Sequence, residues 1–322
     1  MKAVVYTKYG PPEVLQLKEV EKPIPKENEV LVKVFATTVN RTDCGFRKPE
    51  YPILIRPIHG IFKPRKQILG TEFSGNIESV GKDVKSFKVG DKVFGLTANN
   101  FGAHAEYLCI REEQAISTMP VNASYEEAAA VNDGVMLALN YIKKIDIQRG
   151  TKILIYGASG SIGTAAVQLV KYYGAEVTAV CNTKNLEIVK SLGADYVIDY
   201  TKETLSKLSG KFDFVFDAVG KISIFYCKKI LKPGGIYFST DLGFLAQNPL
   251  LAFTKIKIGR RKVIFPIPKE SKEDVVFIKQ LMEERKYRAV IDRVYSLEQI
   301  VDAYRYVETE QKTGNVVITF TH

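Results

Sequence analysis

Three glycines near the middle of the chain have the spacing of a phosphate-binding turn. Gly157, Gly160 and Gly163 follow the apolar stretch 152–156 and precede the helix-like stretch 164–173. In such a turn the first glycine permits a tight bend, the second lets backbone N–H groups approach a pyrophosphate, and the third lets helix and strand pack closely. The helix N-terminus adds unpaired N–H donors. The pattern predicts dinucleotide binding; the alternative is a turn with a structural role only.

The residues after the next strand indicate which dinucleotide binds. An NAD site would place Asp or Glu there, about 20 residues past the loop, to accept from the ribose 2′-OH. The chain has Asn182, Thr183 and Lys184 instead, which offer hydrogen-bond donors and a positive charge. This set favours NADPH, with its 2′-phosphate; the alternative is that Lys184 only begins a helix. Tyr200, after the third strand, is expected on the adenosine phosphate side.

Strands and helices alternate around this loop. Six strands with interspersed helices predict a doubly wound parallel sheet of the Rossmann type, in an α/β fold. The predicted strands are Lys152–Tyr156, Glu176–Cys181, Tyr196–Asp199, Phe212–Ala218, Gly235–Thr240 and Lys262–Ile267.

The flanking segments predict a second domain. Residues 1–122 contain mainly alternating strand patterns and turn residues. A capping box at Ser124 and Glu127 opens a helix that is predicted to reach about Lys144, within a nucleotide-binding domain of residues 123–267. Residues 268–322 are expected to return to the first domain. Their predicted elements are helix 272–286, strand 290–295, helix 297–308 and strand 315–320, and the basic loop Pro52–Gln67 is expected to shape a pocket.

Composition narrows the function classes. The 322 residues are 46% hydrophobic, enough for two globular domains, and no apolar run reaches the roughly 20 residues of a membrane span. The net charge of +10 comes from scattered lysines and arginines, so no nucleic acid partner is expected. The cysteines Cys44, Cys109, Cys181 and Cys227 form no CxxC pair, which suits a reducing cytoplasm.

An ordered series of motifs extends over nearly the whole chain. They are LGTEFSG at 69–75, VGDKVFG at 89–95, GAHAEY at 102–107, the segment 150–171, SLGAD at 191–195, FDAVG at 216–220, KPGG at 232–235 and GNVVI at 314–318. The chain thereby resembles the medium-chain dehydrogenase/reductase superfamily, in particular its zinc-free quinone oxidoreductase branch. The resemblance implies a mainly-β, GroES-like catalytic domain beside the Rossmann domain. Short-chain dehydrogenases have a similar loop, but at the N-terminus and with a Tyr-x-x-x-Lys pair, which this chain lacks.

The frame of a catalytic zinc site is recognisable, but its ligands are missing. Zinc alcohol dehydrogenases of the superfamily use Cys, His and Cys. Here Asn40 stands at the first position, Thr71 stands at the second, and 131–134 contains no cysteine. His59 falls in a loop, and His104 is expected to be structural. Because a catalytic zinc needs three convergent protein ligands, no metal is expected.

Without a metal to polarise the substrate, electrophilic acceptors are favoured. Quinones and α,β-unsaturated ketones or aldehydes accept hydride directly from nicotinamide, while the protein positions the reactants and stabilises the developing oxyanion. The resemblance places Asn40, Asp43 and Thr71 in the catalytic pocket, with Asn132 as a weaker member. Asp43 has an alternative role, which is to hydrogen-bond the backbone of turn 41–45. Solvent or a ribose hydroxyl is open as the proton source.

The resemblance also assigns cofactor contacts outside the loop. Lys312 and Asn315 are expected to approach the cofactor, the alternative being a place on the exposed surface. The full predicted cofactor set is Asn40, Asn132, Gly157, Ala158, Ser159, Gly160, Ser161, Ile162, Gly163, Asn182, Thr183, Lys184, Tyr200, Ala218, Val219, Lys312 and Asn315.

The hypothesis is a zinc-independent, NADPH-dependent oxidoreductase that reduces a quinone or an activated alkene. The alternatives are a zinc-type alcohol dehydrogenase-like enzyme with unusual ligands, and a non-catalytic NADPH-binding regulatory or structural protein. The strand Lys262–Ile267 would form the edge of the nucleotide-binding sheet. Because an uncovered apolar edge is a liability, a homodimer through this strand is expected.

Overall fold

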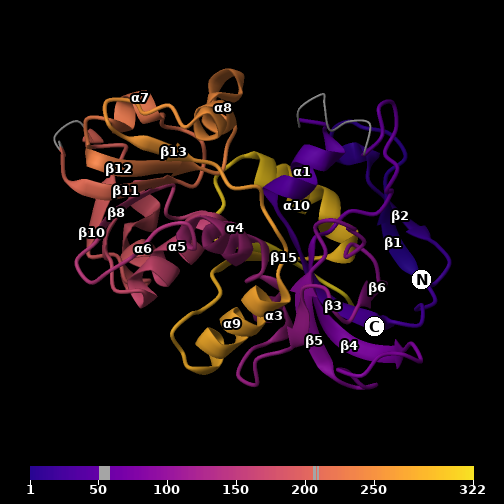
Figure 1. Cartoon of the computed structure of the whole chain (residues 1–322). Coiled ribbons are helices and arrows are strands. Elements are labelled where there is room, and N and C mark those ends of the chain that lie inside the picture. The colour runs from indigo at the N-terminus through magenta and orange to yellow at the C-terminus, as the bar shows by residue number, and fades with distance from the viewer. Residues whose placement is uncertain (51–58, 206–207, 209) are drawn as a thin grey trace. The chain divides into compact units, whose positions relative to one another are not determined.

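The computed structural model describes residues 1–50, 59–205, 208 and 210–322, so the first half of the loop Pro52–Gln67 lies outside the described residues. The chain forms two compact units (Figure 1). The first combines Met1–Asp133 with Glu270–His322, and the second is Gly134–Lys269. The sequence predicts the boundaries at 122/123 and 267/268. The structure keeps residues 123–133 in the first unit because helix α3 (Tyr125–Ala129) packs on that unit's sheet.

Within its described residues, the first unit is built on a seven-stranded sheet of order β14-β15-β3-β4-β5-β7, with β6 also paired to β3. The last strand of the chain, β15, runs parallel to β14 and antiparallel to β3, so it ties the C-terminal segment to the N-terminal one. A separate pair joins β1 and β2. The bounds are β1 Lys2–Val5, β2 Gln16–Glu19, β3 Glu29–Val39, β4 Glu72–Val80, β5 Lys92–Leu96, β6 Tyr107–Arg111, β7 Ile116–Thr118, β14 Ile291–Ser296 and β15 Asn315–Thr319.

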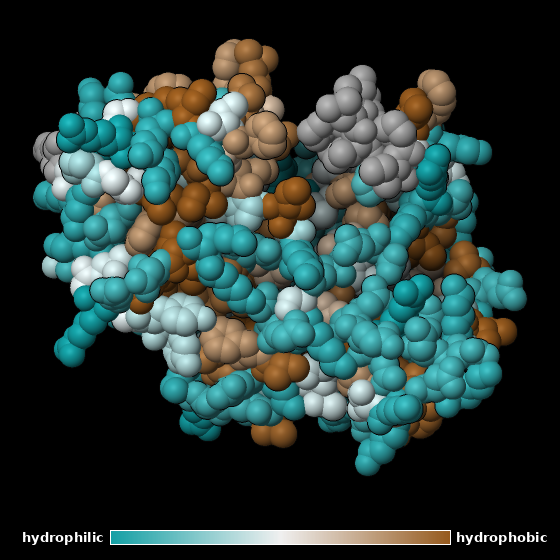
Figure 2. Space-filling view, viewed as in Figure 1, coloured by the Kyte–Doolittle hydropathy of each residue, from teal (hydrophilic) through white to brown (hydrophobic). Residues whose placement is uncertain are grey.

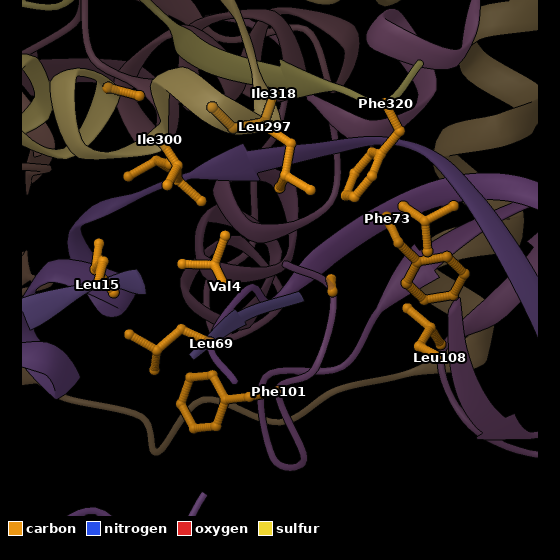
Figure 3. Packing of buried hydrophobic residues seen from close by; sticks show 14 of the residues in the cluster. Val4, Leu15, Leu69, Phe73, Phe101, Leu108, Leu297, Ile300, Ile318 and Phe320 are labelled. Atoms are coloured by element: carbon orange, nitrogen blue, oxygen red, sulfur yellow. The ribbon is translucent and has the colours of Figure 1, made fainter. Parts of the chain in front are cut away.

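Helix α10 (Ile300–Glu308) illustrates how the core of this unit is closed. Its buried residues Ile300, Ala303, Tyr304 and Val307 recur at helical spacing and form one face. Ile300 and Leu297 belong to the same buried cluster as residues of the N-terminal segment, and Figure 3 shows them beside that part of the core. Besides α3, the described part of the unit also contains helices α1 (Arg41–Arg47) and α9 (Lys272–Glu283).

The second unit contains, among its described residues, a six-stranded sheet of order β10-β9-β8-β11-β12-β13 with every pair parallel. This confirms the predicted doubly wound sheet. The strands are β8 Lys152–Tyr156, β9 Glu176–Cys181, β10 Tyr196–Asp199, β11 Phe212–Asp217, β12 Leu231–Ser239 and β13 Lys262–Ile264. The unit also contains helices α4 (Asp133–Ile142), α5 (Ser161–Tyr172), α6 (Leu186–Ser191), α7 (Ile224–Cys227) and α8 (Gln247–Thr254). The main deviations from prediction lie in β12, which begins four residues early, and β13, which is shorter than predicted.

The long helix predicted from Ser124 to about Lys144 is wrong. The capping box at Ser124 and Glu127 is present, but α3 ends at Ala129 and a second helix, α4, covers Asp133–Ile142. The cause is a tertiary contact. The buried carboxylate of Glu72 accepts hydrogen bonds from the backbone N–H groups of Asn132 (3.0 Å) and Asp133 (2.7 Å), the positions where a continuous helix would use its own carbonyls.

Hydrophilic residues cover most of the face shown in Figure 2, in keeping with the scattered charge of the sequence. In the described part of the chain, no helix has both the length and the apolarity to cross a bilayer. The cysteines Cys44, Cys109, Cys181 and Cys227 are free there.

Candidate active site

Two glycines of the loop after β8 are required by the protein itself. Gly157 has φ = +77°, and a Cβ there would lie 2.6–2.7 Å from the methyl groups of Val219. A Cβ on Gly163 would collide with the carbonyl oxygen of Gly157 and lie 2.7 Å from the Cα of Ala158. These positions therefore need glycine to let strand β8, the loop and helix α5 pack together.

Gly160 has no such internal reason to be glycine. Its backbone is in the ordinary extended region (φ = −76°, ψ = 177°), and the nearest atom to an added Cβ would be the Gly157 oxygen at 3.8 Å. Alanine would therefore fit the protein. The predicted pyrophosphate contact would give a reason for glycine here, because a ligand would approach the bare backbone closely.

Helix α5 begins with donors that have no acceptor. Its N-cap is Gly160, which has no side chain to cap the helix. Among the described residues, no acceptor faces the backbone N–H groups of Ser161, Ile162 or Gly163, whereas the next N–H, of Thr164, bonds the Gly160 oxygen at 2.8 Å. These positions are partly or fully buried. Unpaired donors at the positive end of a helix fit a pyrophosphate group.

The residues that follow β9 are partly engaged with one another. The hydroxyl of Thr183 donates to the Asp199 carboxylate at 2.5 Å, so its hydrogen is already used. The Asn182 side-chain oxygen accepts from Asn185 at 2.7 Å, which leaves the Asn182 NH₂ group as its donor toward a ligand. Lys184 is exposed. The ring of Tyr200 lies 6.3 Å from that of Tyr156, so Tyr200 flanks the end of β8.

Asp199 contacts the predicted cofactor residue Thr183 but was not itself predicted from the sequence. It ends β10, and its pKa is lowered by the hydrogen bond from Thr183, so it carries a negative charge next to the predicted 2′-phosphate region. Lys202 lies 3.8 Å from it and offsets part of that charge. An acid at the end of the neighbouring parallel strand is the sequence signal that could have identified it.

The motif after β11 is organised by another acid. Asp217 is fully buried and accepts hydrogen bonds from the N–H groups of Val219 (3.2 Å), Gly220 (2.9 Å) and Ile222 (3.1 Å). The bonds fix the loop that carries the predicted residues Ala218, which is buried, and Val219, which is partly exposed. Val219 in turn lies against Gly157.

In the first unit, Asn40, Asp43 and Thr71 lie together. Asn40 is the N-cap of α1: its side-chain oxygen accepts from the Asp43 N–H at 3.0 Å, and its own N–H donates to the Asp43 carboxylate at 3.1 Å. Its NH₂ group donates to the Thr71 hydroxyl at 2.7 Å. The oxygen of Thr71 is therefore occupied as an acceptor, which leaves its hydroxyl hydrogen as a donor.

The second carboxylate oxygen of Asp43 accepts from the Gly70 N–H at 3.0 Å. Both carboxylate bonds come from backbone N–H groups, but their donors Asn40 and Gly70 lie outside the turn 41–45 that the alternative role for Asp43 names. Burial raises the pKa of this carboxyl to about 7. Asp43 therefore positions α1 and the segment before Thr71. Near pH 7 its carboxyl group is divided between the protonated and the ionised form.

Glu72 is the centre of this cluster. It is fully buried, and besides the N–H groups of Asn132 and Asp133 it accepts from the hydroxyl of Thr38 and from the Asn40 NH₂ group at 3.5 Å. Burial raises the pKa of Glu72 and that of Asp133, and the nearby charge of Glu72 raises the pKa of Asp133 further. In the sequence, Glu72 stands out only as part of the motif at residues 69–75.

Asn132 has an orphaned buried oxygen. Its NH₂ group donates to the carbonyls of Ala128 (3.0 Å) and Ala129 (3.3 Å), but its side-chain oxygen has no partner among the described residues. A buried acceptor left unpaired costs stability, so a ligand donor would satisfy it. This supports the weaker of the predicted pocket assignments.

Lys312 and Asn315 are partly used within the protein. The Lys312 ammonium donates to the Gly314 carbonyl, and the charges of Glu72 and Asp133 act on it while burial lowers its pKa. Asn315 is buried and donates through its side chain to the Val290 carbonyl at 3.1 Å. Neither lies on the open surface, which was the alternative expected from the sequence.

The residues at the zinc-ligand positions do not fit a catalytic zinc. Asn40 and Thr71 hydrogen-bond each other, and no group of three His, Cys, Asp or Glu is placed to hold a metal in the described ranges. His104 is fully buried, its Nε2 contacts the Thr38 carbonyl at 2.9 Å, and burial lowers its pKa to about 4. It is therefore a neutral structural histidine.

The chain matches two family models: an alcohol dehydrogenase GroES-like domain over residues 26–136 and a zinc-binding dehydrogenase over residues 192–318. It is 34% identical to the 2-methylene-furan-3-one reductase of Solanum lycopersicum, over 99% of this chain and 79% of that one. It is 31% identical to the chloroplastic NADPH-dependent alkenal/one oxidoreductase of Arabidopsis thaliana, with the same coverage. The solved quinone oxidoreductase of Coxiella burnetii superposes with a TM-score of 0.88 at 28% identity, over 99% of both chains.

The chain is a medium-chain dehydrogenase/reductase. It belongs to the quinone oxidoreductase-like branch and is an oxidoreductase. The first unit is the GroES-like domain and the second unit is the Rossmann domain. The predicted fold class is therefore confirmed.

The Gly160→Ala variant of this dehydrogenase/reductase should fold normally and lose cofactor. The added methyl meets open space in the protein but blocks phosphate approach, so we expect NADPH affinity to fall about tenfold or more, which corresponds to about 1.4 kcal/mol. Gly163→Ala should instead lower the free energy of unfolding. Thermal unfolding and fluorescence titration with NADPH separate the two. Wild-type NADPH affinity in Gly160→Ala would show that the loop does not hold phosphates.

The buried Asp43 should make stability depend on pH. Its folded-state pKa of about 7 lies above the ordinary 3.8, so the folded protein holds a proton that the unfolded chain has released. The free energy of unfolding is therefore highest below pH 3.8. It falls as pH rises toward about 7, by at most on the order of 4 kcal/mol. Urea unfolding across this range should show a shallower decline for Asp43→Asn than for wild type. Equal slopes would mean that Asp43 is charged in the fold.

Proposed function

We propose that this protein is a zinc-independent, NADPH-dependent reductase of quinones or activated alkenes. The observation that carries the proposal is the hydrogen bond between Asn40 and Thr71, which places two neutral partners at the positions of zinc ligands. The named activities of the relatives on furanones, alkenals or enones and quinones support the acceptor class. All of these acceptors carry an oxygen that becomes negative as hydride arrives.

The chemistry needs a donor aimed at that oxygen. NADPH, when bound, supplies the hydride from its nicotinamide ring. The Thr71 hydroxyl accepts from Asn40, so its own hydrogen is directed away from Asn40 and is available for a developing oxyanion. Asn40 is held by Asp43 and Glu72, so the donor is preorganised before substrate binds. Such a donor acts most strongly where water is excluded, and Thr71 is fully buried.

Each unit offers the cofactor its own contacts. The N–H groups at the start of α5 would bind the pyrophosphate, and the Asn132 side-chain oxygen would accept from an amide of the nicotinamide end. Lys184 and the NH₂ group of Asn182 would bind the 2′-phosphate, which supports NADPH over NADH. The name of the alkenal/one oxidoreductase agrees with this choice.

Two parts of the proposal concern assembly and location. Strand β13 lies at the end of the Rossmann sheet and pairs only with β12 among the described strands, so its free edge supports a homodimer.

The free cysteines support a reducing compartment, for which we propose the cytoplasm, although the alkenal/one relative is chloroplastic.

Activity and metal content together test the acceptor chemistry. Wild type should oxidise NADPH with enones or quinones, contain no stoichiometric zinc and keep its activity after chelation. Thr71→Val should lower kcat about 10²–10³-fold, the effect of removing one oxyanion donor, while Thr71→Ser should retain most of it. NADPH binding by both variants checks the fold.

Other results would favour the alternatives. Stoichiometric zinc whose removal abolishes turnover would establish a zinc-type alcohol dehydrogenase-like enzyme. Tight NADPH binding without turnover across the acceptor panel would establish a non-catalytic binding protein.

Lys184→Ala tests the choice of cofactor. Loss of a charge-assisted contact should weaken NADPH about 10–100-fold, as expected for about 1.5–3 kcal/mol, and leave NADH affinity unchanged. Lys190→Ala, an exposed lysine in the same helical region, is the matched control. An unchanged preference for NADPH in Lys184→Ala would refute the 2′-phosphate assignment.

A further inference from the structure

The proposed oxyanion donor, Thr71, lies in a backbone segment that a neighbouring loop holds in place. This loop covers residues 97–104, directly after β5, and we call it the 97–104 loop. Four of its N–H groups donate to successive carbonyls of that segment: Thr97 to Thr71 at 2.6 Å, Ala103 to Gly70 at 3.2 Å, and both Gly102 (3.2 Å) and His104 (2.9 Å) to Leu69. The position of the Thr71 backbone therefore depends on the shape of this loop.

The 97–104 loop contains a turn that needs support from its surroundings. Phe101 has φ = +57°, and a residue with a side chain stays in this left-handed region only when its neighbours hold it there. The ring of Phe101 is buried against Phe46 of α1, with 4.8 Å between the ring centroids, and Figure 3 shows Phe101 beside Leu69. The core thus holds one side of the turn, which leaves residues 98–100 to be held from outside.

Glu270 supplies that support. Its Oε1 atom accepts from the Asn99 N–H at 2.6 Å, and hydrogen bonds to an ionised carboxylate are stronger than neutral ones. Lys66 adds bonds to the Asn99 carbonyl at 2.8 Å and to the Asn100 side-chain oxygen at 3.1 Å. The peptide groups on both sides of Asn99 are therefore bound by side chains from distant parts of the first unit.

Glu270 is itself fixed by the helix that follows it. Ser271 is the N-cap of α9, and its hydroxyl oxygen accepts from the Asp274 N–H at 3.3 Å. Helix α9 packs on β7, and β7 pairs with β5, the strand that leads into the 97–104 loop. Glu270 and the loop are therefore anchored to the same sheet, so their hydrogen bond joins two segments that are already well placed.

We propose that Glu270 is a positioning residue for the reaction: through the Asn99 N–H it holds the 97–104 loop, and thereby keeps the Thr71 hydroxyl in place for the developing oxyanion. Such a donor is effective only when its geometry is fixed before the reaction begins. The inference rests on the proposed function, because Glu270 acts through Thr71 alone.

A double-mutant cycle with Thr71 tests this role. With saturating NADPH and an enone acceptor, Glu270→Ala should lower kcat about 10–100-fold, the loss expected for a displacement of about 1 Å. NADPH affinity should be unchanged. In a Thr71→Val background the same substitution should cause little further loss, because the donor that Glu270 positions is already gone. Glu270→Gln should keep most of the wild-type kcat, since its amide oxygen can accept from Asn99.

Two further variants make the test specific. Glu284→Ala is the matched control, because Glu284 is an exposed acid at the other end of α9 that contacts Gln280 and Lys286. It should turn over like wild type. Lys66→Met removes an exposed side chain that holds the same turn, and it should lower kcat in the wild-type background only. If thermal unfolding shows that Glu270→Ala does not fold, Lys66→Met decides the question, and an unchanged kcat would then overturn the inference.

The cycle also separates this inference from the proposed function. A wild-type kcat in Glu270→Ala, beside a lowered kcat in Thr71→Val, would overturn the positioning role alone. Equal fold-losses from Glu270→Ala in both backgrounds would do the same, since Glu270 would then act elsewhere. A wild-type kcat in Thr71→Val would overturn the donor role of Thr71 and the role of Glu270 with it.

Discussion

The burial of the Glu72 carboxylate constrains the rest of the catalytic unit. A carboxylate without solvent is tolerated only when donors surround it, and those donors come from β3, the α1 N-cap and the turn between α3 and α4. The same group therefore divides one predicted helix into two, orients Asn40 and fixes the backbone beside Asn132. One buried carboxyl group thus joins residues more than ninety positions apart in sequence.

The two units handle polar groups in opposite ways. In the GroES-like unit, the acids Asp43 and Glu72 are surrounded by donors, so the cluster is closed and rigid. In the Rossmann unit, the start of α5 keeps backbone donors that have no acceptor among the residues that the structure describes. The first arrangement preorganises a site, and the second leaves a place for an anion. The proposed zinc-independent reductase, which would polarise its substrate with hydrogen bonds alone, would use both arrangements.

Much of the fold could be predicted from sequence because buried parallel strands such as β8 and β9 are continuous apolar runs between glycines. The glycine loop and the missing zinc ligands could be predicted because each is a pattern of residues close together in the sequence. The broken helix could not be predicted, since its cause is the distant Glu72. Asp199 and Asp217 were missed for the same reason: each acts through neighbours that only the fold identifies. The orphaned oxygen of Asn132 likewise has no sequence signature.

The position of β15 has a consequence for biosynthesis. This strand pairs with β3 on one side and β14 on the other, although residues 315–319 follow β3 by more than 270 positions. A ribosome therefore releases the whole Rossmann unit before the GroES-like sheet can be completed. The part of β3 that β15 covers, residues 36–39, stays unpaired during that time and is exposed to wrong partners. The Rossmann unit can fold completely, and can already bind cofactor, while the GroES-like unit with Asn40 and Thr71 is still incomplete.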